Sequence, residues 1–506
     1  MSGRARLARL AMLAAVLASG ALLSACGGGG GGGTTTPAPA PTTPVPSTPS
    51  PPAPVITIGA SPASLDVGQA VSLTWSAQDT GAASCSASGA WSGQQATSGT
   101  TTLVAAPPAA GFGGASSATI TYTITCGSTV ASASVQVKAA PLANFVTLTV
   151  DGGPASAGNQ INLPYVSVTV CRPGTTTCAT IDHVLVDTGS YGLRLLAPAA
   201  LALGLPAQTT PSGAAAGECA QFIGGYTWGA VVTADLKLGG ESASALPVQL
   251  IGASPGGVAT TPAACSGAGA NIGTVKALAA NGILGVGLLR HDCGSACVNS
   301  AISGAYYSCS GATCTATRMP LASQVSNPVA SFAVNNNGVL LDLPDVGSSG
   351  LPSLDGTLVF GINTAANNAI TTQTLLRANS SANFTTIYKG VTMSASFIDS
   401  GSNGLFFNDA SLTRCSLSTG FYCPTSTLLL NATTVAADGS ATRVINFRID
   451  NVESFGAGIN AAHVGGPSGS AAGGGNNVFD WGLPFFFGRK VFVGMENGGV
   501  RGYWAY

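Results

Sequence analysis

Residues 184–193 read Val-Leu-Val-Asp-Thr-Gly-Ser-Tyr-Gly-Leu, and residues 396–405 read Ser-Phe-Ile-Asp-Ser-Gly-Ser-Asn-Gly-Leu. Each stretch runs from an apolar, strand-like segment into Asp-(Thr or Ser)-Gly-Ser and then, through a short turn, into a second apolar segment. A single Asp-Thr-Gly-Ser is common by chance in a chain this rich in glycine and threonine. Two copies in matching apolar frames indicate the duplication of a whole structural unit.

The repeated motif suits a pair of acids at the centre of a cleft. An apolar strand carries its aspartate to the strand end, and the glycine lets the chain turn there without a side chain that blocks an opposing loop. If Asp187 and Asp399 face each other, their like charges prevent both from ionising, so the pair shares one proton. One carboxylate can then take a proton from water while the protonated carboxyl polarises a carbonyl. We therefore predict Asp187 and Asp399 as catalytic residues that need neither a metal nor another cofactor.

Across residues 141–506 the sequence resembles the pepsin family of aspartic peptidases. The resemblance implies an all-β fold of two lobes, residues 141–330 and residues 331–506. It also implies an aspartic endopeptidase that holds an extended polypeptide in the cleft between the lobes and cleaves it with an activated water.

The resemblance assigns supporting roles to the rest of each motif. The hydroxyl that follows each aspartate would brace one loop against the other, and the last serine of each motif would hydrogen-bond the outer oxygen of its aspartate. The second copy has serine in place of threonine, an exchange that keeps the hydroxyl and that some active members share. The supporting set is Thr188, Gly189, Ser190, Ser400, Gly401 and Ser402.

Two later segments match the apolar-apolar-Gly stretch that crosses beneath each active-site loop in that family. Residues 281–285, Asn-Gly-Ile-Leu-Gly, match it closely. Residues 480–486, Asp-Trp-Gly-Leu-Pro-Phe-Phe, match it more loosely, because Asp480 stands where an apolar residue is usual.

The family also closes a hairpin over its substrate, usually with a tyrosine near the tip. Residues 221–240 lie where this hairpin is expected. Tyr226 and Phe222 are both candidates for the tip position, and their spacing does not decide between them. If Phe222 occupies it, the phenolic hydrogen bond of the family is absent and less efficient turnover is expected.

Residues 55–139 predict a separate β-sandwich that resembles bacterial immunoglobulin-like modules. Four segments alternate apolar and polar residues with the period of two expected for half-buried strands: 55–58, 71–75, 120–126 and 133–137. Cys85 and Cys126 are expected to link its two sheets.

The chain has 13 cysteines, and setting Cys26 aside leaves an even number, as expected for a disulfide framework in an exported protein. Candidate pairs that lie close in sequence are Cys171 with Cys178 and Cys415 with Cys423. The connectivity of the remaining six is open, because Cys293 and Cys297 could bond to each other or to Cys309 and Cys314. These six are Cys219, Cys265, Cys293, Cys297, Cys309 and Cys314.

The N-terminus resembles a bacterial lipoprotein signal. Three arginines precede the apolar run 10–23, which leads into Leu-Ser-Ala-Cys at 23–26. We predict a signal peptide over residues 1–26, lipidation of Cys26, and a disordered Gly/Thr/Pro-rich tether over residues 27–54. The protein would then be anchored in the cell envelope by its lipid. Gly27 after the cysteine favours the outer membrane.

Composition narrows the function classes. Only 7% of residues are charged, against about 25% in an average globular protein, and the net charge is −1, so no nucleic-acid footprint is present. The three histidines, His183, His291 and His463, are scattered and form no zinc-ligand pattern.

The expected partner is a polypeptide substrate or, alternatively, a surface protein ligand bound by a two-lobed fold that has lost turnover. A glycosidase with two carboxylates fits less well, because it does not explain two symmetric loops.

Overall fold

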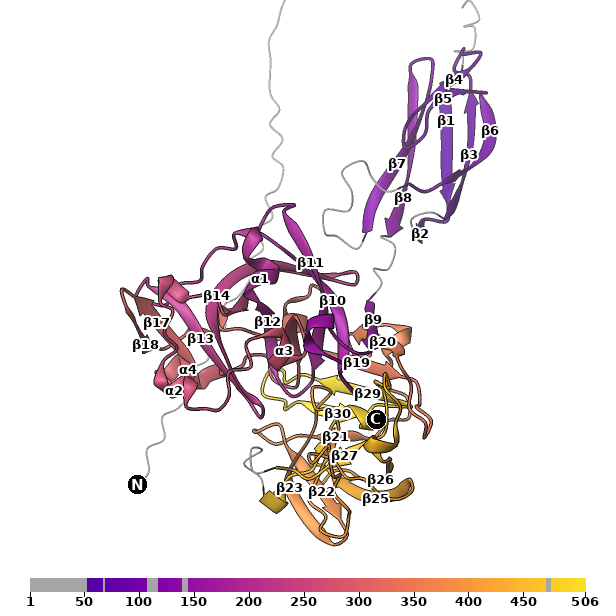
Figure 1. Ribbon diagram of the computed structural model, residues 1–506. Coiled ribbons are helices and arrows are strands. Elements are labelled where there is room, and N and C mark those ends of the chain that lie inside the picture. The colour runs from indigo at the N-terminus through magenta and orange to yellow at the C-terminus, as the bar shows by residue number, and fades with distance from the viewer. Residues whose placement is uncertain (1–51, 67–68, 107–116, 139–143, 470–474) are drawn as a thin grey trace, which may run out of the picture. The chain divides into compact units, whose positions relative to one another are not determined.

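The computed structural model describes residues 52–66, 69–106, 117–138, 144–469 and 475–506 (Figure 1). The predicted signal peptide, the lipidation site Cys26 and nearly all of the tether lie outside these residues. Within the described ranges, no helix combines the length and the apolar character needed to cross a bilayer. The chain forms two compact units, a small one drawn from residues before Gln136 and a large one that contains Gln136–Tyr506.

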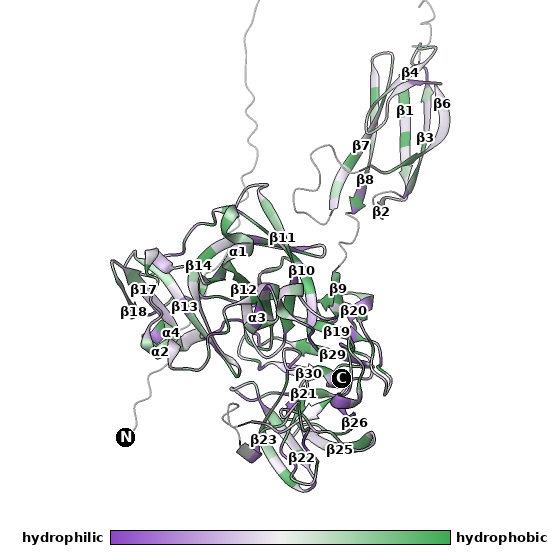
Figure 2. Ribbon diagram, viewed as in Figure 1, coloured by the Kyte–Doolittle hydropathy of each residue, from purple (hydrophilic) through white to green (hydrophobic). Residues whose placement is uncertain are grey.

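The small unit is a β-sandwich of a three-stranded sheet, ordered β1-β3-β6, and a five-stranded sheet, ordered β2-β8-β7-β4-β5. Alternating hydropathy produces it, as the banded colouring of β1 illustrates (Figure 2), and the buried face of β3 presents Val71, Leu73 and Trp75. The strands are β1 (Val55–Ser61), β2 (Ser64–Asp66), β3 (Ala70–Gln78), β4 (Cys85–Gly89), β5 (Gly93–Gln95), β6 (Ser98–Val104), β7 (Ser117–Cys126) and β8 (Thr129–Lys138).

The Cys85–Cys126 disulfide forms, but the expectation that it links the two sheets is wrong. Cys85 opens β4 and Cys126 closes β7, and these strands are antiparallel neighbours in the five-stranded sheet. Their Cα atoms lie 4.3 Å apart, close to the spacing of directly opposed residues in an antiparallel pair. The bond therefore reinforces one sheet, and the buried Trp75 and Trp91, in edge-to-face contact, contribute to the core instead.

The large unit is all-β and has two lobes that share a set of linking strands. The N-terminal lobe contains β10 (Pro164–Cys171), β11 (Cys178–Asp187), β12 (Tyr191–Leu196), β13 (Ala215–Phe222), β14 (Gly225–Leu238), β15 (Glu241–Ile251), β16 (Gly282–Val286), β17 (Tyr306–Ser310) and β18 (Thr313–Ala316). The C-terminal lobe contains β22 (Phe384–Tyr388), β23 (Val391–Ile398), β24 (Leu405–Phe406), β25 (Leu428–Val435), β26 (Thr442–Ile449), β27 (Gly465–Gly466) and β28 (Asp480–Trp481).

The linking strands continue the sheet of the N-terminal lobe, in the order β9-β20-β19-β29-β30-β21. They are β9 (Phe145–Val150), β19 (Gly338–Leu343), β20 (Leu354–Phe360), β21 (Leu375–Arg377), β29 (Arg489–Gly494) and β30 (Tyr503–Ala505). One apolar core runs through both lobes and the linking strands, since it includes Val186, Leu341, Ile398 and Trp481. The lobes are thus joined by a shared sheet and a shared core.

The helices are short. They are α1 (Ala197–Ala200), α2 (Ala263–Ser266), α3 (Val275–Leu278) and α4 (Gly294–Asn299), with single 3₁₀ turns at Ala155–Ala157, Leu201–Leu203, Pro255–Gly257, Leu321–Ser323, Pro328–Ser331, Ala366–Asn368, Val452–Ser454, Gly475–Asn477 and Leu483–Phe485.

Of the remaining five disulfides, four join cysteines at most eight residues apart, and Cys219–Cys265 spans 46 residues. Of the pairings that the sequence left open, Cys293 bonds to Cys297 and Cys309 to Cys314. The bonds are Cys171–Cys178, Cys219–Cys265, Cys293–Cys297, Cys309–Cys314 and Cys415–Cys423. The Cys309–Cys314 bond closes the hairpin of β17 and β18, which extends the sheet beside β13.

The same three-strand crossing occurs once in each lobe. In the N-terminal lobe, β16 lies between β11, to which it is parallel, and β12, to which it is antiparallel. In the C-terminal lobe, β28 lies between β23 and β24 in the same orientations. Gly285 and Gly482 sit at these crossings without room for a side chain: a Cβ at Gly285 would lie 2.6 Å from Tyr191 N, and one at Gly482 would overlap Gly404 O. Each crossing fixes the loop that carries an aspartate.

Candidate active site

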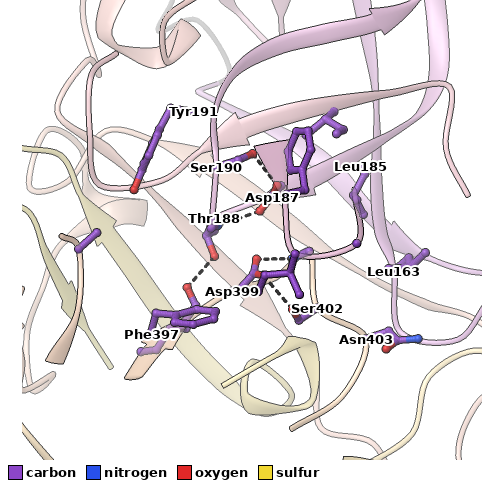
Figure 3. Close-up of a pocket in the computed structure, with 18 of the residues that line it drawn as sticks. Leu163, Leu185, Asp187, Thr188, Ser190, Tyr191, Phe397, Asp399, Ser402 and Asn403 are labelled. Atoms are coloured by element: carbon purple, nitrogen blue, oxygen red, sulfur yellow. Dashed lines mark hydrogen bonds between the residues drawn. The ribbon is translucent and has the colours of Figure 1, made fainter. Parts of the chain in front are cut away.

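The two motif loops face each other across one cavity (Figure 3). Asp187 is the last residue of β11, and Asp399 directly follows β23. Both are buried, with 7% and 9% of their surface exposed, and both line a cavity of about 870 Å³. The apolar strands hold the carboxyls at the strand ends, because the residues before each aspartate pack into the core.

The two carboxyls approach each other closely enough to share a hydrogen bond. The glycine of each loop makes this approach possible. A Cβ at Gly189 would lie 2.7 Å from Asp399 Cγ, and a Cβ at Gly401 would lie 2.9 Å from Asp187 Oδ1. Any larger residue at either position would push the opposing aspartate away.

The hydroxyls that follow the aspartates connect the loops reciprocally. Thr188 Oγ1 donates to the carbonyl of Ile398 at 3.1 Å and accepts from Ser400 N at 2.9 Å. Ser400 Oγ donates to the carbonyl of Val186 at 2.7 Å and accepts from Thr188 N at 3.1 Å. All four bonds are buried, so each loop holds the other in register.

Each carboxyl is also held by its own loop. The backbone N–H of the motif glycine donates to Oδ1 of the aspartate at 2.8 Å in both loops. The last serine of each motif donates to the other oxygen, from Ser190 Oγ to Asp187 Oδ2 at 2.5 Å and from Ser402 Oγ to Asp399 Oδ2 at 2.9 Å. The whole predicted supporting set therefore lies around the two aspartates.

Burial and like charge make the two acids unequal. Burial, followed by the neighbouring charges of Asp187 and Asp480, raises the pKa of Asp399 well above its ordinary value, and the Gly401 N–H offsets only part of this rise. The pair cannot bear two negative charges at such short range. The raised pKa therefore favours Asp399 as the member of the pair that holds the shared proton.

Of the two flap candidates, Phe222 faces the cavity and Tyr226 does not. β13 and β14 form a hairpin whose turn is Ile223–Gly224, and Phe222, just before the turn, lines the cavity. Tyr226 is buried with Trp228 and other residues in a separate cluster. The hairpin therefore brings an aromatic ring to the cavity without a phenolic hydroxyl.

The sequence did not single out Tyr191, which supplies a phenol from another direction. It directly follows the first motif, lines the cavity and is labelled in Figure 3. Burial, followed by the charges of Asp187, Glu496 and Asp399, raises the pKa of its hydroxyl, so it stays a neutral hydrogen-bond donor. The sequence feature that could have identified Tyr191 is its position in the repeat. The second copy has Asn403 at the same position, and Asn403 also lines the cavity.

A buried ion cluster, also missed, underlies the flap. Arg194 Nη2 lies 2.5 Å from Glu218 Oε1 and 3.2 Å from Asp292 Oδ2, and the Tyr306 hydroxyl donates to Asp292 at 2.8 Å. Burial and the adjacent Glu218 raise the pKa of Asp292, because one guanidinium serves two carboxyls. Since Glu218 belongs to β13 and the Arg194 guanidinium lies 5.9 Å from the centre of the Phe222 ring, the cluster anchors the flap hairpin.

The histidines are not part of the cavity wall. His183 lies near Asp151 and Asp182, while His291 and His463 line other pockets. In the described ranges, the group of possible metal ligands is Cys415, Cys423 and Glu453. Its two sulfurs are joined in a disulfide, so they cannot bind a metal as thiolates.

Comparisons with known proteins give the family. Residues 140–506, which span both lobes, match the family described as "Protein of unknown function (DUF3443)". A search of curated proteins found no match. Among solved structures, the chain is similar to the aspartic proteinase from Irpex lacteus, with 17% sequence identity over 71% of this chain and 96% of that chain and a TM-score of 0.38. Because the family match covers most of the sequence, the chain belongs to the DUF3443 family.

Proposed function

We propose that the large unit is an aspartic endopeptidase that hydrolyses extended polypeptides, with Asp187 and Asp399 as its catalytic pair. The observation that supports it best is the close approach of two buried aspartates from loops that repeat the same motif. Each loop is also braced by the other, which keeps the two carboxyls in register.

The chemistry follows from the charge states. The Asp187 carboxylate takes a proton from a water held between the two acids, and the water oxygen attacks the peptide carbonyl. Asp399 gives its proton to the carbonyl oxygen, where negative charge develops, and a tetrahedral diol forms. Asp187 then passes the proton it took from the water to the leaving nitrogen, the C–N bond breaks, and a diol hydroxyl returns its proton to Asp399 as the carboxylic acid product forms. Ser190 and Ser402 keep the outer carboxyl oxygens occupied, so both inner oxygens face the water.

The cavity fits an extended, largely apolar segment. Among the described residues, its wall carries no charged side chain besides the two aspartates, and it includes Leu163, Leu185 and Phe406. Such a wall binds by apolar burial, and affinity beyond that comes from hydrogen bonds to the backbone of the substrate.

We also infer that the enzyme is anchored in the cell envelope, at the outer membrane, by lipid on Cys26, with residues 27–54 as a spacer. The lipobox-like Leu-Ser-Ala-Cys and the Gly/Thr/Pro composition support this. Cys26→Ser should move the protein from the detergent-extracted membrane fraction to the soluble fraction. Retention of the variant with the membranes would contradict the anchor.

A second candidate is a two-lobed binding protein without turnover, which the phenol-free flap residue Phe222 favours. Full-length protein in mild detergent, incubated with an unfolded protein between about pH 3 and 7, distinguishes the two. The peptidase predicts cleavage that a pepstatin-type inhibitor blocks and that Asp187→Asn abolishes while its circular dichroism is unchanged. If the folded wild type cleaves nothing across this range, the binding protein is the better account.

A further inference from the structure

Asp480 places a third carboxyl beside the dyad. It lies on β28, where its register partners are Phe397 on β23 and Phe406 on β24. Directly paired residues on neighbouring strands share a face, and on β23 Asp399 lies on the same face as Phe397, two residues on. Phe397 and Phe406 both line the cavity. Asp480 therefore lies between two phenylalanines of the cavity wall and on the same face as Asp399, with only 4% of its surface exposed.

The Asp480 carboxyl reaches Asp399 through one hydroxyl. Its side chain is hydrogen-bonded to Ser402, and Ser402 Oγ donates to Asp399 Oδ2 at 2.9 Å. Its buried Oδ1 has no hydrogen-bond partner. A serine hydroxyl has a single hydrogen, so when Ser402 donates to Asp399 it can only accept from Asp480. The consistent arrangement has Asp480 protonated, donating to Ser402, which in turn donates to Asp399.

The N-terminal lobe has no such chain. Ile283 occupies the position on β16 that corresponds to Asp480, since its register partner is Leu185, two residues before Asp187. Ser190 Oγ donates to Asp187, as Ser402 does to Asp399, but an isoleucine stands where the C-terminal lobe has its third acid. The extra carboxyl thus distinguishes Asp399 from its twofold mate.

We propose that Asp480 is a positioning residue of the active site, which acts through Ser402 to keep the shared proton on Asp399 over a wider range of pH. This inference rests on the proposed peptidase function. As a neutral acid Asp480 fixes the direction of the Ser402 hydroxyl, which leaves Asp399 Oδ2 as an acceptor and its proton on Oδ1, toward Asp187. As a carboxylate it adds a negative charge that disfavours the ionisation of Asp399.

The direction of the effect follows from the groups around it. Burial raises the pKa of Asp480 to about 8, and the Asp480 charge in turn raises the pKa of Asp399. The titratable groups that face this pair are Asp187 on β11 and, on the far side of the dyad, Tyr191 on β12 with Glu496 after β29. On β23 and β24 the neighbours of Asp480 are phenylalanines. These groups are neutral or acidic, and the hydrogen bond with Ser402 offsets only part of the rise in the pKa of Asp480.

The pH dependence of kcat tests the proposal in the full-length protein. Asp480→Asn keeps a donor for Ser402 and removes the acid, so the basic limb of the profile should move down by about one pH unit, with kcat near pH 4 little changed. Asp480→Ile, which copies the N-terminal lobe, removes the donor to Ser402 as well and should move the limb at least as far. Ile283→Asn, the matched polar change in the other lobe, should leave the limb in place. A loss of kcat that is uniform over pH, or an unmoved limb, would overturn the proposal.

A second measurement separates this inference from the peptidase itself. Carbon-13 labelling of aspartate side chains lets the titration of Asp399 be followed by NMR without any substrate. The proposal requires Asp399 to lose its proton at lower pH in Asp480→Asn than in the wild type. If this shift occurs in a protein that cleaves nothing, the peptidase function fails while the coupling of the carboxyls stands. If cleavage occurs and Asp399 titrates identically in both, only the role of Asp480 is refuted.

Discussion

The two lobes place different residues at the same strand crossing. In the N-terminal lobe, Arg194 on β12 lies opposite Ile283 on β16. In the C-terminal lobe, Phe406 on β24 lies opposite Asp480 on β28. Each crossing thus carries one ionisable and one apolar side chain on exchanged strands, with a base in the N-terminal lobe and an acid in the C-terminal lobe. The backbone has kept the twofold relation that brings the aspartates together, while the side chains behind it have diverged.

The divergence gives the two halves of the site separate tasks. In the N-terminal lobe the charge belongs to a buried cluster that anchors the flap through Glu218. In the C-terminal lobe the ionisable group is the buried acid Asp480, which acts on Asp399 through Ser402. Symmetry therefore sets the position of the two acids, and asymmetry sets which of them holds the proton.

The largest expected effect tests the symmetric part of the site. Asp187→Asn removes the base and Asp399→Asn removes the acid, so each should lower kcat for cleavage of an unfolded protein by about 10³-fold or more. Urea unfolding at the assay pH should show that both variants remain folded. A variant that kept most of the activity would show that its carboxyl is not part of the reaction.

The next effect tests the asymmetric charge of the N-terminal lobe. Arg194→Met leaves Glu218 and Asp292 buried without a cation, and we expect a loss of about 3–5 kcal/mol in the free energy of unfolding at pH 7. The loss should shrink near pH 4, because the carboxyls can then be protonated at little cost. Phe406→Met at the corresponding position should cost only about 1 kcal/mol. Equal losses for the two variants would contradict the difference between the crossings.

A smaller effect tests the brace that joins the lobes. Thr188→Val keeps the shape of the side chain but leaves the buried Ser400 N–H without its acceptor, and Ser400→Ala does the same to Thr188 N. Each should cost about 2 kcal/mol in urea unfolding. The double variant should cost less than the sum, since either change already breaks the reciprocal arrangement. Additive losses would show that the two hydroxyls act independently.

The sequence predicted the symmetric features better than the asymmetric ones, for a physical reason. The loops could be inferred because an apolar frame, an aspartate and a glycine are consecutive in the chain, and each copy supports the other. Phe222 and Tyr226 could not be separated, because the turn at Ile223–Gly224 decides which face of the hairpin each residue occupies. A shift of one residue in that turn would exchange them.

Contacts between distant segments that share no repeated motif could not be predicted from the sequence. Arg194, Glu218 and Asp292 come from separate parts of the chain and follow no shared pattern, so only the folded sheet brings them together. Asp480 was visible as an exception to an apolar pattern, yet its link to Ser402 depends on strand register. In the small unit, likewise, Cys85 and Cys126 could be paired from the sequence, but not assigned to one sheet.

The smallest expected effect concerns Asp480 in the C-terminal lobe and can be measured without an activity assay. The folded protein raises the pKa of Asp480 to about 8, above its value in the unfolded chain. The folded state therefore binds the proton more tightly, and the associated stability, full below about pH 4, is lost as the pH rises through about 8.

Asp480→Asn has no proton to lose. Its thermal midpoint should exceed that of the wild type by at least about 2 °C at pH 9 and match it near pH 4. Because Ile283→Asn introduces the same amide at the twofold-related position without removing an acid, any change in its midpoint should be the same at both pH values. A midpoint difference between Asp480→Asn and the wild type that does not vary with pH would mean that Asp480 is already ionised in the folded protein across this range, and that the two lobes differ there in packing alone.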